Sequence, residues 1–150
     1  MLIELEGLPV STNASLMAQG SRLIHTTVAR NYRKSAALAI SNQISQQIRI
    51  NPELDNELQA MVNEPLFCEI RLFSNWITQK ATIRKTDLAN REKLCIDSLV
   101  SVLNSNGYKI DDSQIYLMLM SKHDNRGLPD KTQITLKLLK TFNTDTDQDN

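Results

Sequence analysis

The chain has 150 residues, which is enough for one domain with a substantial hydrophobic core but not for two. Its 17 basic and 17 acidic residues cancel, so the chain as a whole is not a polycation. Cys68 and Cys95 have neither zinc-site spacing nor a disulfide framework, so we expect buried free thiols in a reducing compartment.

The N-terminal region predicts a strand followed by irregular chain. Residues 2–8 alternate apolar and acidic side chains, which is the pattern of a strand with one buried face. Residues 9–13, which begin with a proline, break this strand, and we expect residues 14–24 to form a loop around Gly20. The early acids also argue against a signal peptide.

Two helices are predicted next. Thr26 or Thr27 can cap the first one, whose apolar side chains recur at every fourth residue. Asn51 and Pro52 start a second, short helix that ends before Pro65. The apolar stripe of the first helix consists of Val28, Tyr32, Ala36, Ile40, Ile44 and Ile48.

The region after Pro65 predicts a strand, a connector and a helix. We expect the strand over residues 66–73 and a basic connector over 74–86, which holds the only tryptophan, Trp76. Asp87 is expected to cap the helix, which ends near residues 104–107. The stripe of that helix that faces the core is Leu88, Cys95, Leu99 and Val102.

Two further strands complete the chain. Residues 115–120 are all apolar, as expected of a central strand that is covered on both faces. A turn at 125–130 leads to residues 132–138, which alternate as an antiparallel partner. We therefore predict an α/β (α+β) fold, a small mixed sheet of about four strands with helices packed against it. One domain spans residues 1–142, and residues 143–150 form a disordered acidic tail. No segment reaches transmembrane length, so we expect a soluble cytoplasmic protein with no membrane partner.

Charge is distributed unevenly along the chain. There is no acid between Gly7 and Pro52, and the six bases between Arg71 and Lys93 face only two acids. Two basic stretches beside a group of acidic residues suit a polyanionic substrate that is held around a metal ion. A solvated helix face and an ordinary loop would produce the same pattern.

A group of acidic residues with one lysine carries the strongest chemical signal. Asp87 opens the predicted helix, Lys93 lies nearly two turns along it, and Asp111 and Asp112 precede the next strand. If that strand runs beside the helix, the carboxylates meet at one end of the sheet and suit Mg²⁺, or Mn²⁺, bound to a phosphate. Lys93 then faces a nonbridging oxygen or the leaving group. A helix cap, a Lys93–Asp97 surface pair and a solvated turn would explain the same residues without catalysis.

The basic connector predicts contacts with a phosphate backbone. Lys80, Arg84 and Lys85 would hold flanking phosphates without reading the base sequence. His25 and His123 are isolated from each other and from the acids, and we expect no catalytic role for them.

The order of these motifs resembles the RusA-type Holliday junction resolvases, small endonucleases of prophages and some bacteria that cut four-way DNA junctions. The likeness covers roughly residues 2–140. Its early part is the turn Pro9-Val10-Ser11-Thr12-Asn13 and the pair Tyr32-Arg33. Its most specific part reads Asp87-Leu88-Ala89-Asn90-Arg91-Glu92-Lys93, with Asp97 and Leu99, then Gly107 and Asp111-Asp112-Ser113-Gln114.

The resemblance implies a magnesium-dependent homodimer whose two active sites lie on one face and nick symmetric strands of branched DNA. Such an enzyme serves recombination and repair, which implies association with the nucleoid. Asp87, Asp112 and Lys93 carry over as catalytic residues, with Asp87, Asp112 and Asp111 as candidate metal ligands. The candidate DNA-contacting residues are Asn13, Arg33, Lys80, Arg84, Lys85, Asn90 and Arg91.

Ala89 stands where the family has its second motif aspartate, and a methyl group cannot coordinate magnesium. Three explanations compete. The alanine is an engineered substitution, which we favour slightly, or the chain is a natural paralogue that binds junctions without cutting them, or Glu92 or Asp111 supplies the missing ligand. Two other classes stay open, a regulatory or non-catalytic nucleic-acid-binding protein and a protein–protein interaction module.

Overall fold

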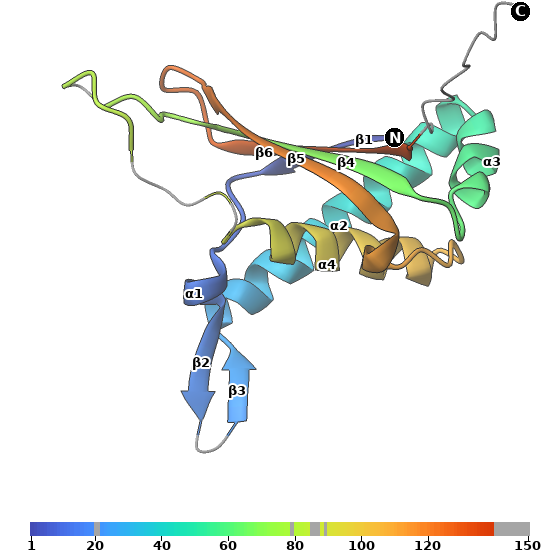
Figure 1. Ribbon diagram of the computed structural model, residues 1–150, viewed down its shortest axis with the longest axis horizontal. Coiled ribbons are helices and arrows are strands. Elements are labelled where there is room, and N and C mark those ends of the chain that lie inside the picture. Colours follow the sequence, from blue (N-terminus) through green and yellow to red (C-terminus); the bar gives the residue numbers. More distant parts are fainter. Residues whose placement is uncertain (20–21, 79, 85–87, 89, 140–150) are drawn as a thin grey trace, which may run out of the picture.

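The computed structural model describes residues 1–19, 22–78, 80–84, 88 and 90–139. Within them, a four-stranded mixed sheet lies against a layer of helices, which confirms the predicted fold class (Figure 1). The strand order is β1-β6-β4-β5, in which β6 is antiparallel to both neighbours and β5 is parallel to β4. The strands of this sheet are β1 (Leu2–Glu6), β4 (Leu66–Ser74), β5 (Ile115–Asp124) and β6 (Lys131–Leu138), and the helices are α1 (Thr12–Ser15), α2 (Thr27–Ile50), α3 (Glu53–Ala60) and α4 (Glu92–Ser105), with a 3₁₀ turn η1 (Asp112–Gln114).

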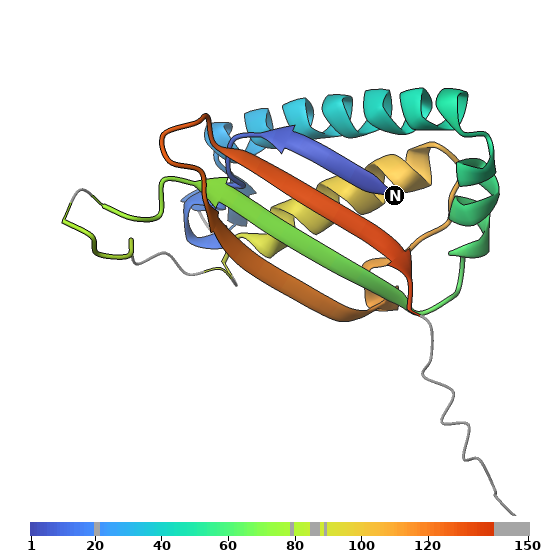
Figure 2. The same ribbon diagram turned by 90° about the horizontal axis from the view of Figure 1, so that it is seen from above.

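The core lies between one face of the sheet and the helices α2 and α4, which run along the same side of it (Figures 1 and 2). Every second residue of β4 from Leu66 to Leu72 is buried, and β6 buries Ile134 and Leu136 in the same way. This alternation produces one apolar face and one open face, because successive strand side chains point to opposite sides.

Helix α2 begins where the sequence predicts it. The Thr26 hydroxyl accepts the Ala29 amide at 3.3 Å, which satisfies one of the unpaired donors at the helix start. Ala29 is buried, whereas Val28, the first residue of the predicted stripe, is exposed. An i, i+4 repeat drifts by about 40° per step in a helix of 3.6 residues per turn. The prediction for Val28 is therefore wrong, although Ile40 and Ile44 are buried as expected.

Residues 14–24 are not a loop. Part of this segment completes α1, and the rest forms a two-stranded ribbon, β2 (Leu16–Gln19) paired antiparallel with β3 (Arg22–His25). Figure 1 shows the ribbon projecting away from the sheet, next to the start of α2. Such short strands leave little periodicity in the sequence, and this one joins no larger sheet, so the pattern could not reveal it.

Helix α4 begins at Glu92 and not at Asp87. Arg91 is the residue that precedes it, and no side chain caps the start. The carbonyl oxygen of Asn90 accepts hydrogen bonds from the amide and, at 3.1 Å, from the hydroxyl of Thr12. This tertiary contact holds Asn90 in a turn, so the prediction of a helix capped by Asp87 is wrong. The predicted end of the helix is confirmed.

Strand β5 lies at an edge of the sheet, although its unbroken apolar sequence predicts a central strand. It pairs with β4 from Leu66↔Ile115 to Ser74↔Asp124, with one irregularity after Leu66. Its apolar residues are mostly exposed. The prediction of a central strand is therefore wrong, because an apolar run does not by itself fix the place of a strand in the sheet.

The predicted acidic tail, residues 143–150, lies outside the described residues. In the part of the chain that the structure describes, no helix has the length and apolar character needed to cross a membrane.

Candidate functional site

A hollow of about 170 Å³ lies between α4 and β5 and contains two of the predicted catalytic residues, Lys93 and Asp112. The Nζ of Lys93 is 3.7 Å from an Asp97 carboxylate oxygen one turn further along α4. The Lys93 side chain is 65% exposed, so this pair leaves its ammonium group accessible from solvent. The full lining is Glu92, Lys93, Ile96, Asp97, Asp112, Ile115 and Met118.

The two neighbouring aspartates before β5 have different roles. Asp111 caps η1, because its carboxylate accepts the Ser113 amide at 2.9 Å while its own amide donates to the Gln114 side chain at 2.8 Å. The Ser113 hydrogen bonds hold the pKa of Asp111 below its usual range. Asp112 lines the hollow and Asp111 does not. Asp112 is therefore the better placed of the two predicted ligands.

The turn after β1 is fastened to the start of α4. Besides the bonds from Thr12 to Asn90, the guanidinium group of Arg91 donates to the carbonyl oxygen of Pro9. Arg91 is half-buried, and its buried Nε has no hydrogen-bond partner among the described residues. Its contact in the structure is thus with the protein backbone, while its predicted role in DNA binding stays a prediction.

Two other predicted DNA-contacting residues lie near the projecting ribbon. Asn13 is exposed in α1. A guanidinium nitrogen of Arg33, nearly two turns into α2, lies 3.1 Å from the imidazole Nε2 of His25 at the end of β3. Both positions are on the side of the molecule where the Pro9–Thr12 turn meets α4.

The basic connector is anchored at its base and exposed further out. Trp76 is buried, and its indole donates to the Leu72 carbonyl oxygen at 2.9 Å. The backbone then folds back, with a bridge between Ile77 and Ile83, and it projects beyond the end of the sheet (Figures 1 and 2). Lys80 and Arg84 are exposed on this projection, and their contact with phosphates stays a prediction.

Three residues on which the prediction depends, Lys85, Asp87 and Ala89, lie outside the described residues. Leu88, which lies between Asp87 and Ala89 in the sequence, packs against the core, and its carbonyl oxygen accepts the Arg91 amide at 2.9 Å.

The donor chemistry of the hollow suits a divalent cation, but the described residues do not complete a site. Glu92, Asp97 and Asp112 offer the carboxylate oxygens that magnesium prefers. No group of three or more Asp, Glu, His or Cys side chains within the described ranges is close enough to hold a metal ion.

The other reactive side chains lie away from the hollow or are buried. Both cysteines are buried free thiols, as predicted, and burial raises the pKa of each to about 12. His123 lies near the far end of β5, where it stacks on Phe73 with ring centroids 4.9 Å apart.

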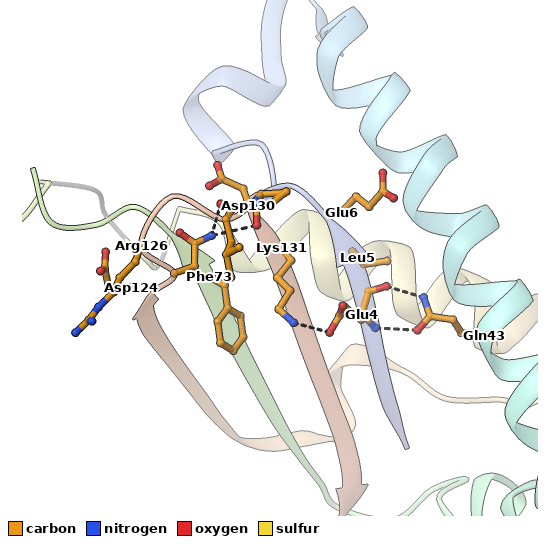
Figure 3. A pocket seen from close by; sticks show the side chains of 12 residues that line it. Glu4, Leu5, Glu6, Gln43, Phe73, Asp124, Arg126, Asp130 and Lys131 are labelled. Atoms are coloured by element: carbon orange, nitrogen blue, oxygen red, sulfur yellow. Dashed lines mark hydrogen bonds and ion pairs between the residues drawn. The ribbon is translucent and has the colours of Figure 1, made fainter.

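A larger concavity lies elsewhere, on the β1 side of the sheet. It is a groove of about 1050 Å³ beside the turn between β5 and β6 (Figure 3). It holds four carboxylates and only two bases, so it disfavours a phosphate backbone. The acids are Glu4, Glu6, Asp124 and Asp130, and the bases are Arg126 and Lys131.

Sequence reasoning missed part of the hollow. Ile96 and Met118 form apolar walls, and their only signal is the spacing that places them opposite each other once α4 and β5 are aligned. Glu92 was considered only as a replacement ligand, and the structure places it in the hollow beside Lys93.

A family comparison agrees with this geometry. The model described as endodeoxyribonuclease RusA matches residues 6–137, from the end of β1 into β6, a range that includes both Lys93 and Asp112. No curated protein matched the chain. Because the family model covers most of its length, the chain belongs to the endodeoxyribonuclease RusA family.

Proposed function

We propose that this protein is a structure-specific endonuclease of the Holliday junction resolvase type, which nicks paired strands of a four-way junction as a magnesium-dependent homodimer. Membership of the RusA family implies endodeoxyribonuclease activity. One observation supports particular residues for this activity: Lys93 and Asp112 line the same hollow. Paired nicks need two identical sites, which a two-fold homodimer provides.

The proposed catalytic roles follow from the chemistry of the side chains. Asp112, together with Asp87, would hold Mg²⁺ through carboxylate oxygens. The bound ion would polarise the scissile phosphate and lower the pKa of a water. Lys93 holds a positive charge at the mouth of the same hollow, where it stabilises negative charge that develops on the phosphate oxygens. Asp97 keeps that ammonium group near the wall of α4.

DNA is held by the projection that precedes the hollow along the chain. Lys80 and Arg84 are exposed there, and the buried Trp76 anchors its base. Contacts of this kind bind the phosphate backbone without reading sequence. They suit a protein that recognises the shape of a junction, and their strength falls as the salt concentration rises.

Ala89 sets the expected activity of this chain. It removes one carboxylate from the family's metal site, so we propose tight junction binding with weak or absent cleavage. Glu92 lines the hollow and Asp111 is engaged as a cap, so Glu92 is the better candidate for a replacement ligand.

A second candidate function is a branched-DNA-binding protein without catalysis. It is favoured by Ala89, which stands where the family has a metal-binding aspartate. In such a protein the exposed bases of the connector would still bind DNA. Restoring the carboxylate with Ala89→Asp would then produce no cleavage.

The test is to restore the carboxylate. The Ala89→Asp variant and the unmodified chain are incubated with a labelled four-way junction and Mg²⁺. We expect symmetric nicks from Ala89→Asp and at least a 100-fold slower rate from the unmodified chain, a range typical for the loss of one electrostatic group in an active site. Tight binding without any cleavage by Ala89→Asp would support the second candidate instead.

A matched control separates the metal site from general damage. Asp112→Asn in the Ala89→Asp background should abolish cleavage and weaken Mg²⁺ binding in a calorimetric titration. Asp111→Asn keeps an acceptor for the Ser113 amide and should change both much less. Equal losses from the two substitutions would argue against the assignment of Asp112.

A further inference from the structure

The two edge strands of the sheet differ in whether their outer backbone groups are hydrogen-bonded. At the β1 edge, the Gln43 side chain accepts the Glu4 amide at 2.9 Å and donates to the Glu4 carbonyl oxygen at 2.6 Å (Figure 3). Gln47 donates to the Leu2 carbonyl oxygen at 2.6 Å. These bonds from α2 occupy the backbone groups to which an additional strand would have to pair. The β1 edge is therefore closed.

The β5 edge has no such cover. Among the described residues, β4 is the strand that pairs with β5, and no side chain hydrogen-bonds the backbone of residues 116–119. Tyr116 is 80% exposed, Leu117 51%, Met118 36% and Leu119 49%. An open edge with four consecutive apolar side chains favours strand pairing between molecules, and natural monomers usually protect such edges with charges or bulges.

The charges near β5 suit pairing with an identical strand. Asp111 and Asp112 precede the apolar run, and Lys122 and His123 follow it. In an antiparallel pair of two copies, the acidic start of one strand lies opposite the basic end of the other, and the apolar runs face each other. A third acid, Asp124, already accepts hydrogen bonds from two backbone amides of the connector.

We propose that β5 is the interface of the dimer. Two copies pair antiparallel through β5 about a two-fold axis perpendicular to the sheet, and their two four-stranded sheets become one continuous sheet. The closed β1 edge excludes a head-to-tail pairing of β5 with β1, which would build a fibre instead of a dimer. The proposal rests on the proposed function for the need of a dimer, whereas the choice of surface rests on the two edges alone.

This interface affects the candidate active site directly. Met118 belongs both to the exposed run of β5 and to the lining of the hollow that contains Lys93 and Asp112. A second β5 would therefore form a wall beside each hollow and exclude water from it. Figure 1 shows the helices of one chain on one side of its sheet. Because the proposed axis is perpendicular to the sheet, the helix layers of both copies, and with them both hollows, would lie on the same side of the combined sheet.

The first test measures mass in solution. The unmodified chain should sediment at twice its 17.0 kDa. The double variant Leu117→Lys, Leu119→Lys places charges on the edge without altering the buried core, and it should sediment as a monomer with an unchanged circular dichroism spectrum. Leu38→Lys is the matched control, since Leu38 is 65% exposed on α2, and it should stay dimeric. A monomeric unmodified chain, or a dimeric double variant, would overturn the proposal.

The second test maps the contact with substitutions that disturb folding less. Leu117→Cys, Met118→Cys and Leu119→Cys are oxidised separately, and the buried Cys68 and Cys95 do not compete. Near a two-fold axis a residue lies opposite its own copy within disulfide reach, so at least one of the three should cross-link the dimer. Leu38→Cys should not. Absence of a cross-link at all three positions would rule out antiparallel β5 pairing.

The outcomes of these tests are separable from those for the proposed function. Cross-linking at β5 with no cleavage by Ala89→Asp would leave the interface standing and remove the nuclease assignment. Cleavage by Ala89→Asp without cross-linking would do the opposite. The two proposals therefore fail independently.

Discussion

The guanidinium group of Arg91 donates a hydrogen bond to the carbonyl oxygen of Pro9, which ties the turn after β1 to the residue before α4. The amide and hydroxyl of Thr12 bind the neighbouring carbonyl oxygen of Asn90. Two segments about 80 residues apart in sequence are thereby joined at the base of the helix that carries Lys93. Hydrogen bonds of this kind position the start of α4 in place of a helix cap.

We expect Arg91→Ala to lower the free energy of unfolding by about 1–2 kcal/mol in urea titrations, because it removes a charged donor from a half-buried carbonyl oxygen. The loss stays at the low end because the buried Nε of Arg91 has no partner in the part of the chain that the structure describes. Arg91→Lys should recover part of the loss.

The control for this prediction is Arg30→Ala on the exposed start of α2, which should change stability by less than about 0.5 kcal/mol. An Arg91→Ala variant that keeps full stability but binds junctions more weakly would assign Arg91 to DNA contact instead.

Most of the architecture could be predicted from sequence because it depends on local signals. The cap at Thr26, the alternation in β6 and the terminator after Ser105 are each encoded within a few residues. The errors occur where a distant partner decides the outcome. Asn90 leaves the helix because Thr12 binds its carbonyl oxygen.

In the candidate site, too, local signals could be predicted and the effects of distant segments could not. Lys93 and Asp112 could be singled out by residue type and spacing, and the alignment of α4 with β5 brings them into one hollow. The exposure of β5 could not be predicted, because an apolar run has the same sequence whether its neighbours come from its own chain or from a second copy.

The two buried thiols should make the protein less stable in alkali. Burial raises the pKa of both Cys68 and Cys95 from the ordinary value of 9.0 to about 12. Between these values the unfolded chain releases thiol protons that the folded chain retains, so stability is full below pH 9 and falls as the pH rises toward 12. The slope should be on the order of 1 kcal/mol per pH unit for each thiol.

Urea titrations at pH 8 and pH 10 measure this effect, with Cys68→Ala as the comparison. The variant is less stable overall but should lose less stability between the two pH values than the unmodified chain. In the native protein at pH 8, thiol reagents should label neither cysteine until urea is added. Rapid labelling of either thiol would contradict the burial.

The exposed bases of the connector should control the salt dependence of junction binding. Each phosphate contact contributes about −0.9 to the slope of log K against log salt concentration on duplex DNA. Lys80→Ala combined with Arg84→Ala should therefore reduce the magnitude of that slope by about 2 and weaken binding at low salt. Arg49→Ala, at the far end of α2, is the control and should leave the slope unchanged. Gel shifts from 50 to 300 mM salt give both values, and equal slopes would exclude these two residues from the phosphate contacts.

Lys93 should act on the chemical step and not on binding. In the Ala89→Asp background, Lys93→Ala should lower the single-turnover rate by about 100-fold or more, because the group that stabilises charge on the phosphate is lost. The junction dissociation constant should change by only a few-fold, since many other bases hold the backbone. Arg49→Ala, which removes an exposed base at the far end of α2, is the control and should change neither the rate nor the dissociation constant.

The separation between rate and affinity distinguishes a catalytic lysine from an ordinary phosphate contact. If Lys93→Ala weakens binding as much as it slows cleavage, Lys93 is a DNA-gripping residue like Lys80. If Lys93→Arg restores the rate, the site needs only a positive charge, whereas a persistent loss shows that it needs the compact ammonium group in the hollow beside Asp112. Single-turnover kinetics with excess enzyme separates these cases, because the observed rate then reports the bound complex alone.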